Sequence, residues 1–213
     1  MSVLVKICGL TNLDDAMDAL DCGADLLGFN FYPDSPRYID PELAFDIFEE
    51  IPGNVEKVGI FVNRDLKEVL DIAVEFNLDF LQFHGDETPE YCNQVGRPWF
   101  KAFRLKAEQD LIEIPKYESR WLLVDAHVEK AFGGTGVISD WHLAREAKKF
   151  GQLFLSGGLK PDNIEMALDA VKPYAVDVAS GVEESPGIKD KQKMEEFVAR
   201  VRAWSTKNCK GNP

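Results

Sequence analysis

Eight short apolar runs, rich in β-branched and aromatic residues, alternate with helix-like segments along this 213-residue chain. The segments between the runs predict helices over 12–22, 41–50, 65–76, 88–95, 140–149, 161–171 and 190–204. Strands that alternate with helices lie parallel, and eight of them close a barrel whose interior is filled by side chains. We therefore predict an α/β protein, a single-domain (β/α)8 TIM barrel with strands over 3–8, 24–31, 57–62, 79–84, 99–105, 120–126, 152–158 and 175–180.

Prolines mark several of the predicted boundaries. Proline stands at the first position of three predicted helices, where its missing N–H is tolerated, in Asp40–Pro41, Thr88–Pro89 and Lys160–Pro161. The segment KAEQDLIEIPKYESR after the fifth strand is short and broken by Pro115, so we expect a short or irregular fifth helix. No linker marks a second domain, and we expect the barrel to span 1–205 and a frayed tail to span 206–213.

Composition excludes several classes of protein. A net charge of −13 and a pI near 4.7 leave no basic stripe for nucleic acid or an acidic membrane surface. The apolar runs are far shorter than the roughly 20 residues that cross a bilayer, and MSVLVKICGL lacks a basic leader, so we expect a cytoplasmic protein. The four cysteines show no CxxC spacing and no nearby histidine at ligand spacing, so we expect neither disulfides nor a metal site.

Two glycine-containing turns follow the last two strands. In a barrel of this kind the loops after the strands form the active face. Backbone N–H groups at Gly157–Gly158 and at Ser180–Gly181 would lie near helix N-termini, where the helix dipole favours a phosphate. A tight turn without a ligand is the alternative for each pair alone, but two such turns on neighbouring strands favour a small phosphorylated molecule.

Cys8 and Asp125 end two apolar strands, VLVKIC and WLLVDA. A thiol just before a helix favours the thiolate, because a helix dipole depresses the thiol pKa from about 8.5. A small buried hydrophobic residue is the alternative for Cys8. Burial could raise the pKa of Asp125 and make it an acid near neutral pH, whereas a turn cap is the alternative. We predict a thiol base and a carboxylic acid that face one pocket.

Further polar residues are predicted to contact the ligand. Arg37 lies in FNFYPDSPRYI, between prolines and beside aromatic rings, which suits a flat ring that bears a carboxylate, because guanidinium binds carboxylate in bidentate fashion. A solvated surface arginine is the alternative. Gln82, His84 and Asp177 occupy other strand ends. His127 is also an acid/base candidate by residue type, but neither histidine has a carboxylate at relay spacing.

A series of motifs runs in order along nearly the whole chain: KICGLT, LGFNFYPDSPRYI, VGIFVN, LQFHGDE, LLVDAHVEKAFGGTG, LSGGLKPDNI and VDVASGVEESPGIKD. Together they resemble the phosphoribosylanthranilate isomerases. The resemblance implies a step of tryptophan biosynthesis, the Amadori rearrangement of N-(5-phosphoribosyl)anthranilate to 1-(2-carboxyphenylamino)-1-deoxyribulose 5-phosphate. It implies Cys8 as general base, Asp125 as general acid and Arg37 as the anchor of the anthranilate carboxylate. It also covers the phosphate-loop positions Gly157, Gly158, Ser180 and Gly181 and the rim positions Gln82, His84 and Asp177.

The implied chemistry needs no cofactor, because protonation of the furanose ring oxygen opens the sugar to an aryl iminium that serves as its own electron sink. We expect a small phosphorylated substrate as the partner and a chain that acts as a monomer or a homodimer.

Three residues depart from the family pattern. Val137 and Asp34 stand where the family often has basic residues, and Asn30 stands where an aliphatic residue is common. They make the rim more acidic than a doubly anionic substrate would suggest.

Three other interpretations fit the sequence less well. An open doubly wound sheet would need a glycine-rich dinucleotide turn after the first strand, and CGLTN does not match GxGxxG. A sugar-phosphate epimerase or a histidine-pathway isomerase would need paired aspartates or metal-ligand histidines at several strand ends. A barrel that only binds a phosphorylated metabolite would have no need of Cys8 and Asp125.

Overall fold

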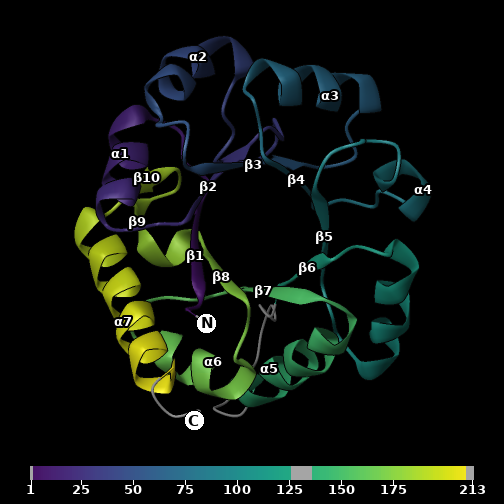
Figure 1. The fold of residues 1–213 in the computed structure, drawn as a ribbon, viewed down its shortest axis with the longest axis vertical. Coiled ribbons are helices and arrows are strands. Elements are labelled where there is room, and N and C mark those ends of the chain that lie inside the picture. The colour runs from purple at the N-terminus through teal and green to yellow at the C-terminus, as the bar shows by residue number, and fades with distance from the viewer. Residues whose placement is uncertain (1, 126–135, 210–213) are drawn as a thin grey trace.

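The computed structural model describes residues 2–125 and 136–209. Its eight long strands are all parallel and close into a barrel in sequence order, with the first strand paired to the eighth (Figure 1). The predicted (β/α)8 barrel is therefore confirmed. The strands are β1 (Leu4–Cys8), β2 (Leu26–Asn30), β3 (Glu56–Phe61), β4 (Phe80–Phe83), β5 (Trp99–Phe103), β6 (Trp121–Asp125), β7 (Gln152–Ser156) and β8 (Ala175–Val178).

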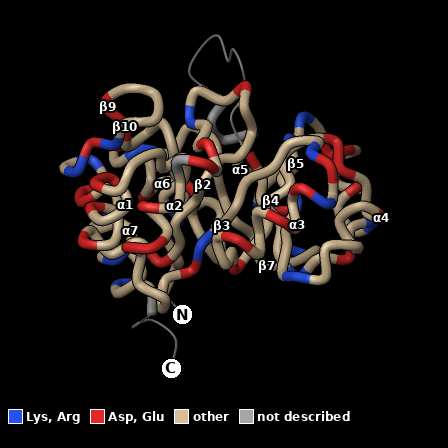
Figure 2. The backbone as a smooth tube through the Cα atoms, turned by 90° about the horizontal axis from the view of Figure 1, so that it is seen from above, with Lys and Arg blue, Asp and Glu red and all other residues tan. Residues whose placement is uncertain are grey.

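Helices surround the barrel (Figure 1), and each predicted helical segment overlaps one, although α5 begins before the predicted start at 140 and α7 ends after the predicted end at 204. None of the helices in the described ranges is long and apolar enough to cross a membrane. Acidic and basic residues are interspersed along the chain (Figure 2). The helices are α1 (Leu13–Asp21), α2 (Pro41–Glu50), α3 (Leu66–Glu75), α4 (Pro89–Cys92), α5 (Gly136–Ala147) followed by the 3-10 turn η2 (Lys148–Phe150), α6 (Ile164–Val171) and α7 (Lys191–Cys209).

Two of the three proline-marked helix starts are confirmed, and the third is wrong. Asp40 caps α2 by accepting from the Glu42 amide at 2.9 Å, and Thr88 caps α4. The third helix, α6, begins at Ile164 and not at 161. Asn163 explains the shift, because its Oδ1 accepts from the Lys160 amide at 2.9 Å and holds the intervening residues as a turn.

The segment after β5 and the end of the chain behave differently. The fifth connection is the 3-10 helix η1 (Glu108–Tyr117) with Pro115 inside it, which confirms the predicted irregular fifth helix. The last helix, α7, continues to Cys209, four residues beyond the boundary predicted at 205. Ser205 accounts for this continuation, because it is buried and its hydroxyl accepts from the Val3 amide at 3.1 Å, which fixes this turn against the residue before β1. Residues 210–213 of the predicted tail lie outside the described residues.

A small hairpin after β8 was not predicted. The 3-10 turn η3 (Ser180–Val182) leads into β9 (Glu183–Ser185), which pairs antiparallel with β10 (Ile188–Lys189). Gly187 adopts φ +86° in the connecting turn, a conformation that favours glycine. The hairpin lies at the end of the barrel opposite the N-terminus (Figure 2). It is therefore on the same side as the C-terminal ends of the strands.

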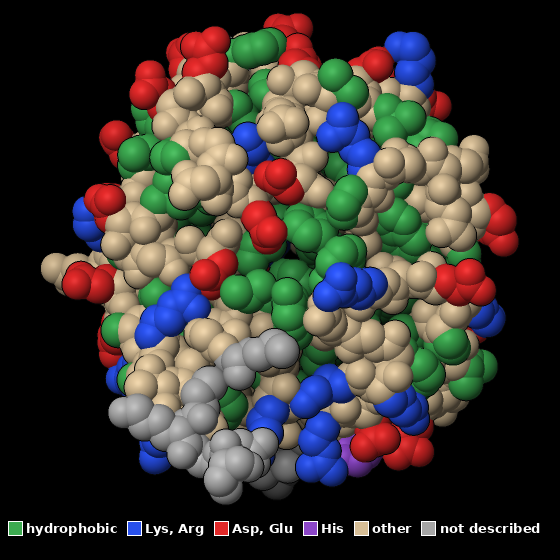
Figure 3. Space-filling model, viewed as in Figure 1, with side chains coloured by type: hydrophobic (Ala, Val, Ile, Leu, Met, Phe, Trp, Pro, Cys, Tyr) green, Lys and Arg blue, Asp and Glu red, His purple; other side chains and the backbone are tan. Residues whose placement is uncertain are grey.

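Side chains on the strands alternate between the barrel interior and the helices. Outward residues such as Val5 and Ile7 of β1 join the large core between barrel and helices. Mainly over the N-terminal and middle parts of the strands, inward residues form a separate apolar group, here called the lower cluster. On the face shown in Figure 3, hydrophobic side chains gather around the centre of the ring. The lower cluster consists of Leu26, Val58, Phe100, Ala102, Leu123, Phe154 and Ala175.

Candidate active site

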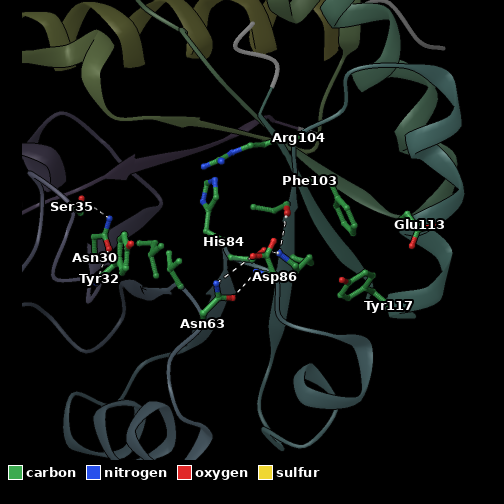
Figure 4. A pocket seen from close by; sticks show the side chains of 15 residues that line it. Asn30, Tyr32, Ser35, Asn63, His84, Asp86, Phe103, Arg104, Glu113 and Tyr117 are labelled. Atoms are coloured by element: carbon green, nitrogen blue, oxygen red, sulfur yellow. Dashed lines mark hydrogen bonds between the residues drawn. The ribbon is translucent and has the colours of Figure 1, made fainter. Parts of the chain in front are cut away.

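Two adjoining cavities open where the strands end. The smaller, of about 340 Å³, is lined by Cys8 of β1 and Asp125 of β6, two strands that β7 and β8 separate in the barrel. The larger, of about 780 Å³, lies over the ends of β2 to β5 (Figure 4). Both are lined by His84 and Arg104, so they form one continuous depression. The other residues that line both are Asn30, Ser35 and Ile60.

The smaller cavity gathers nearly all of the predicted site residues. Gly181 is the exception. It is not among the residues that line the cavity, and a Cβ at this position would collide with the Leu159 carbonyl, so the absence of a side chain lets the two turns pack together. The predicted residues that line the cavity are Cys8, Arg37, Gln82, His84, Asp125, Gly157, Gly158, Asp177 and Ser180.

Cys8 lies at the last position of β1 in a charged environment. Burial raises the pKa of the Cys8 thiol above its ordinary value, and the carboxylate of Asp177 raises it further. The ammonium groups of Lys6 and Lys189 act in the opposite direction. The lowered thiol pKa that the sequence predicted is therefore wrong, and the resting thiol is protonated at neutral pH. The two lysines provide the positive charge that would stabilise a thiolate when it forms.

Lys6 is a fully buried lysine inside the barrel, two residues before Cys8 on the same inward row of β1. Its Nζ donates to Asp177 Oδ1 at 2.6 Å and to Gln82 Oε1 at 3.0 Å. Burial alone would lower the pKa of Lys6, but Asp177 and Cys8 raise it above 10.5, so the lysine stays charged. Ser156 completes the group by donating to Asp177 Oδ2 at 3.0 Å. Lys6, Gln82, Asp177 and Ser156 are here called the upper cluster.

His84 follows β4 directly and extends toward Arg104 (Figure 4). Its Nδ1 lies 3.0 Å from Nε2 of Gln82. Burial lowers the pKa of His84 below 6.5, while the nearby carboxylate of Asp125 has the opposite, smaller effect. The imidazole is therefore neutral at pH 7, between the acid candidate and the larger cavity.

Arg37 is held from one side by a carboxylate that the sequence did not point to. Its Nε and Nη2 donate to Oε1 and Oε2 of Glu183 at 2.7 and 2.6 Å, a bidentate ion pair. The hydrogen bond and charge of Glu183 raise the pKa of Arg37. Glu183 also accepts from Nζ of Lys189 at 2.9 Å, and the same Nζ donates to the Cys8 carbonyl at 2.7 Å. The hairpin thus joins Arg37 to the backbone of β1.

The two glycines after β7 form a tight turn that precedes α6. Gly157 and Gly158 adopt φ +95° and +64°, both in the region that favours glycine. Asn163 holds this turn, because its Nδ2 donates to the Gly158 carbonyl at 2.9 Å. With Ser180 on the next loop, the two turns form one wall of the smaller cavity.

One of the three departures from the family pattern has a structural role. Asn30 accepts from the Tyr32 amide at 2.9 Å and donates to Ser35 Oγ at 3.0 Å, which orders the loop that carries Arg37. Asp34 is exposed and accepts from the Tyr32 hydroxyl at 2.9 Å. The side chain of Val137 lies outside the described residues, as does the whole of His127.

Sequence reasoning missed four residues that shape the site. Lys6 carried a signal, since a charge within the apolar strand VLVKIC needs a buried partner. Arg104 follows β5 on the same inward row as Phe100 and Ala102, so strand alternation pointed to it. Glu183 and Lys189 had no local signal, because their roles depend on contacts with Arg37 and Cys8, far away in the sequence.

Comparison with known proteins gives a consistent result. The family model for N-(5'-phosphoribosyl)anthranilate isomerase matches residues 5–200. The N-(5'-phosphoribosyl)anthranilate isomerase of Geobacter sulfurreducens is 48% identical over 202 residues, which are 95% of this chain and all of that protein. A crystal structure of phosphoribosyl anthranilate isomerase from Thermotoga maritima has a TM-score of 0.87 and 41% identity, and the match covers 94% of this chain and 99% of that one.

A second similar structure contains a ligand. It is a phosphoribosyl anthranilate isomerase in complex with reduced 1-(o-carboxyphenylamino)-1-deoxyribulose 5-phosphate, with a TM-score of 0.84 and 40% identity over 94% of this chain and 99% of that one. The barrel, the cavity at its strand ends and the extent of these matches agree. This chain belongs to the N-(5'-phosphoribosyl)anthranilate isomerase family.

Proposed function

We propose that this protein isomerises N-(5-phosphoribosyl)anthranilate to 1-(2-carboxyphenylamino)-1-deoxyribulose 5-phosphate in tryptophan biosynthesis, with Cys8 as general base and Asp125 as general acid. One observation supports these roles most strongly. In a chain of this family, a thiol from β1 and a carboxyl from β6 line one cavity, whose wall also contains the Gly157–Gly158 turn and Ser180. A sugar phosphate bound there would lie between the two groups.

The acid step opens the sugar ring. Asp125 transfers a proton to the furanose ring oxygen, and the bond between that oxygen and C1 breaks. The nitrogen lone pair of the anthranilate forms a C1=N bond at the same time, so an aryl iminium results. A positioned acid of this kind contributes about 10²- to 10⁴-fold to the rate.

The base step moves the proton from C2. The thiolate of Cys8 takes that proton, the electrons form a C1=C2 bond, and the nitrogen recovers its lone pair. The enolamine then becomes the ketone when its C2 hydroxyl loses a proton and C1 gains one. Because burial and Asp177 raise the pKa of Cys8, kcat/KM should rise with pH on the alkaline side of neutrality as the thiolate fraction grows.

Two anionic groups of the substrate would be held at opposite ends. The turns at Gly157–Gly158 and Ser180 would bind the phosphate through backbone N–H groups. Arg37 uses two of its five N–H donors for Glu183, and we assign the others to the anthranilate carboxylate. Gln82, His84 and Asp177 would contact the sugar between these anchors, which orients the reacting atoms.

A fluorescence assay tests the activity. Freshly generated N-(5-phosphoribosyl)anthranilate is mixed with purified protein, without added metal or nucleotide, and the loss of its fluorescence is followed. We expect a decay that depends on protein concentration. A stable signal with substrate bound, measured by equilibrium binding, would instead identify a barrel that binds the phosphorylated metabolite without turnover.

Two substitutions test the assigned roles. Cys8→Ala and Asp125→Asn should each lower kcat at least about 10²-fold, while the fold and the thermal unfolding midpoint stay nearly unchanged. Cys92→Ala is the matched control for Cys8→Ala, because Cys92 is a free, buried cysteine of α4 that does not line the cavity. Near-normal rates in either site variant would refute its role.

The proposal also covers the oligomeric state and the cellular location of the protein. One similar structure is of generated monomers of the dimeric phosphoribosylanthranilate isomerase from Thermotoga maritima, with a TM-score of 0.84 and 40% identity over 94% of this chain and 99% of that one. For this chain we propose a cytoplasmic enzyme that acts as a monomer or a homodimer. Light scattering at several protein concentrations distinguishes the two states, and a larger assembly would contradict both.

A further inference from the structure

A chain of polar side chains crosses the barrel interior from β8 to β4. It runs from Asp177 through Lys6 to Gln82 and ends at His84, with contacts of 2.6, 3.0 and 3.0 Å. Lys6 and Gln82 are almost completely buried, at 0% and 1% exposure. Such a chain admits few arrangements of its hydrogen atoms, since every member must pair with its neighbours.

The charge of Lys6 fixes the orientation of Gln82. An ammonium group has three donors and no acceptor, so the atom of Gln82 that faces it must be the carbonyl oxygen. The amide NH₂ of Gln82 then faces Nδ1 of His84 at 3.0 Å. An NH₂ group only donates, so Nδ1 must accept and carries no proton. In a neutral imidazole the proton is therefore on Nε2.

Two further features support this arrangement. Gly28 of β2 leaves the space that the end of Lys6 occupies, because a Cβ there would lie 3.0 Å from both Cε and Nζ of Lys6. Lys6 and Asp177 lie side by side on the paired strands β1 and β8, which favours their ion pair. The second oxygen of Asp177, Oδ2, accepts from the hydroxyl of Ser156. Lys6 is thus confined by packing and by charge, and the orientation of Gln82 follows from it.

We propose that Lys6 and Gln82 are positioning residues that hold His84 as the neutral tautomer with its proton on Nε2, so that His84 offers the cavity a fixed hydrogen-bond donor. His84 lines both cavities, its ring extends toward Arg104 (Figure 4), and the carboxylate of Asp125 is near enough to affect its charge. A donor there would bind an oxygen of the sugar and would not remove a proton. This role in binding rests on the proposed function, whereas the tautomer does not.

Nuclear magnetic resonance on protein labelled with ¹⁵N in histidine tests the tautomer without any substrate. The chain has only three histidines, and His84→Gln identifies the His84 signals by their loss. Two-bond ¹H–¹⁵N correlations distinguish a protonated Nε2 from a protonated Nδ1. We expect the Nε2–H pattern in the unsubstituted protein. An Nδ1–H pattern would overturn the proposal.

Gln82→Glu tests whether the chain sets the tautomer. A carboxylate accepts only, so the new side chain would accept from both Lys6 and His84, and the proton of His84 should move to Nδ1. An unchanged spectrum would overturn the proposal. Gln82→Met is the second variant if the added charge prevents folding. Gln82→Met removes the partner of Nδ1, so we expect a mixture of the two His84 tautomers. A pure Nε2–H pattern would show that Gln82 does not set the tautomer of His84.

Gln152→Glu is the matched control. Gln152 also lies on a strand and accepts from a cation, Nε of Arg120 at 3.2 Å, but it is at the opposite end of the barrel. The His84 spectrum and the activity should both stay unchanged in this variant. In Gln82→Glu we expect kcat/KM to fall about ten-fold, in line with one misdirected hydrogen bond. A shifted tautomer with unchanged kcat/KM would leave the tautomer assignment intact and overturn the role of His84 as a donor to the substrate.

Discussion

The lower and upper clusters occupy the same barrel interior, yet their chemistry is opposite. In the lower cluster, Phe100 and Phe154 stack with ring centroids 4.9 Å apart, and the surrounding residues are apolar. In the upper cluster, the barrel interior is occupied by the ion pair between Lys6 and Asp177. A buried ion pair is weak evidence for stability, since apolar residues of the same volume often do as well. The difference indicates that the lower cluster serves the fold and the upper cluster serves the cavity above it.

Removing the buried lysine should have the largest effect. Lys6→Met leaves the Asp177 carboxylate buried without its cation, and we expect the free energy of unfolding to fall by about 3–5 kcal/mol, with a loss of activity. Urea unfolding measures the first effect. The double variant Lys6→Met with Asp177→Asn should recover part of the stability but not the activity. A stable and active single variant would remove the distinction between the two clusters.

A cavity in the lower cluster should affect stability alone. Phe154→Ala removes half of the stacked pair, and we expect a loss of about 3–5 kcal/mol in the free energy of unfolding. Activity should be retained at a temperature where the variant is folded, because Phe154 lies below the site. Thermal unfolding and kcat measured at low temperature check both statements. A large fall in kcat of the folded variant would show that the lower cluster also positions the site.

The ion pair on the rim should have a smaller effect, mainly on binding. Glu183→Gln weakens the bidentate support of Arg37, and we expect KM to rise roughly ten-fold with a lesser change in kcat. Steady-state kinetics separates the two constants. The conservative Glu183→Asp should be no less active than Glu183→Gln, because it retains the charge. An unchanged KM in both variants would mean that Arg37 needs no support from the hairpin.

Glu183→Gln is also expected to change the stability of the fold at acid pH. Although burial opposes it, hydrogen bonds from Arg37 and Lys189 lower the pKa of Glu183 below its ordinary value of 4.5. A lowered carboxyl pKa stabilises the fold above the ordinary value, and this contribution is lost as the pH falls through the folded value. Glu183→Gln should therefore flatten the loss of stability below about pH 4.5. Unfolding midpoints measured between neutral and acid pH test this expectation.

The smallest effect is expected on the surface. Lys67 pairs with Asp71 at 2.8 Å on α3, but 84% of its side chain is exposed. Water and salt screen such a pair, so Lys67→Ala should leave the thermal midpoint and the activity unchanged within error. This variant is the baseline for the other four experiments. A measurable loss would show that charge pairs on the outer helices stabilise the barrel.

The fold and most of the cavity lining could be predicted from the sequence because both depend on local patterns. Each strand is a short apolar run, and several of the runs end at a polar residue, as Cys8 and Asp125 show. The ends of parallel strands meet at one rim, so residues distant in the sequence were expected to converge. The start of α6 was misplaced because the proline signal at 161 is the same for a turn and a helix, and only the contact of Asn163 with Lys160 separates them.

Features that depend on long-range contacts could not be predicted in this way. The sequence SPG permits the turn of the β9–β10 hairpin, but nothing in it indicates that Glu183 meets Arg37. The inward direction of Lys6 follows from strand alternation, yet its partners come from β4 and β8. Such pairings require the three-dimensional arrangement of the strands.

Because Gly28 has no side chain, positions 28 and 6 are expected to constrain each other in evolution. Gly28 provides the volume that the end of Lys6 fills, so an alanine there would crowd the lysine. A relative with a shorter residue at position 6 would have room for a side chain at position 28. The two positions are therefore expected to vary together, and a change at one would be accepted more readily after a change at the other.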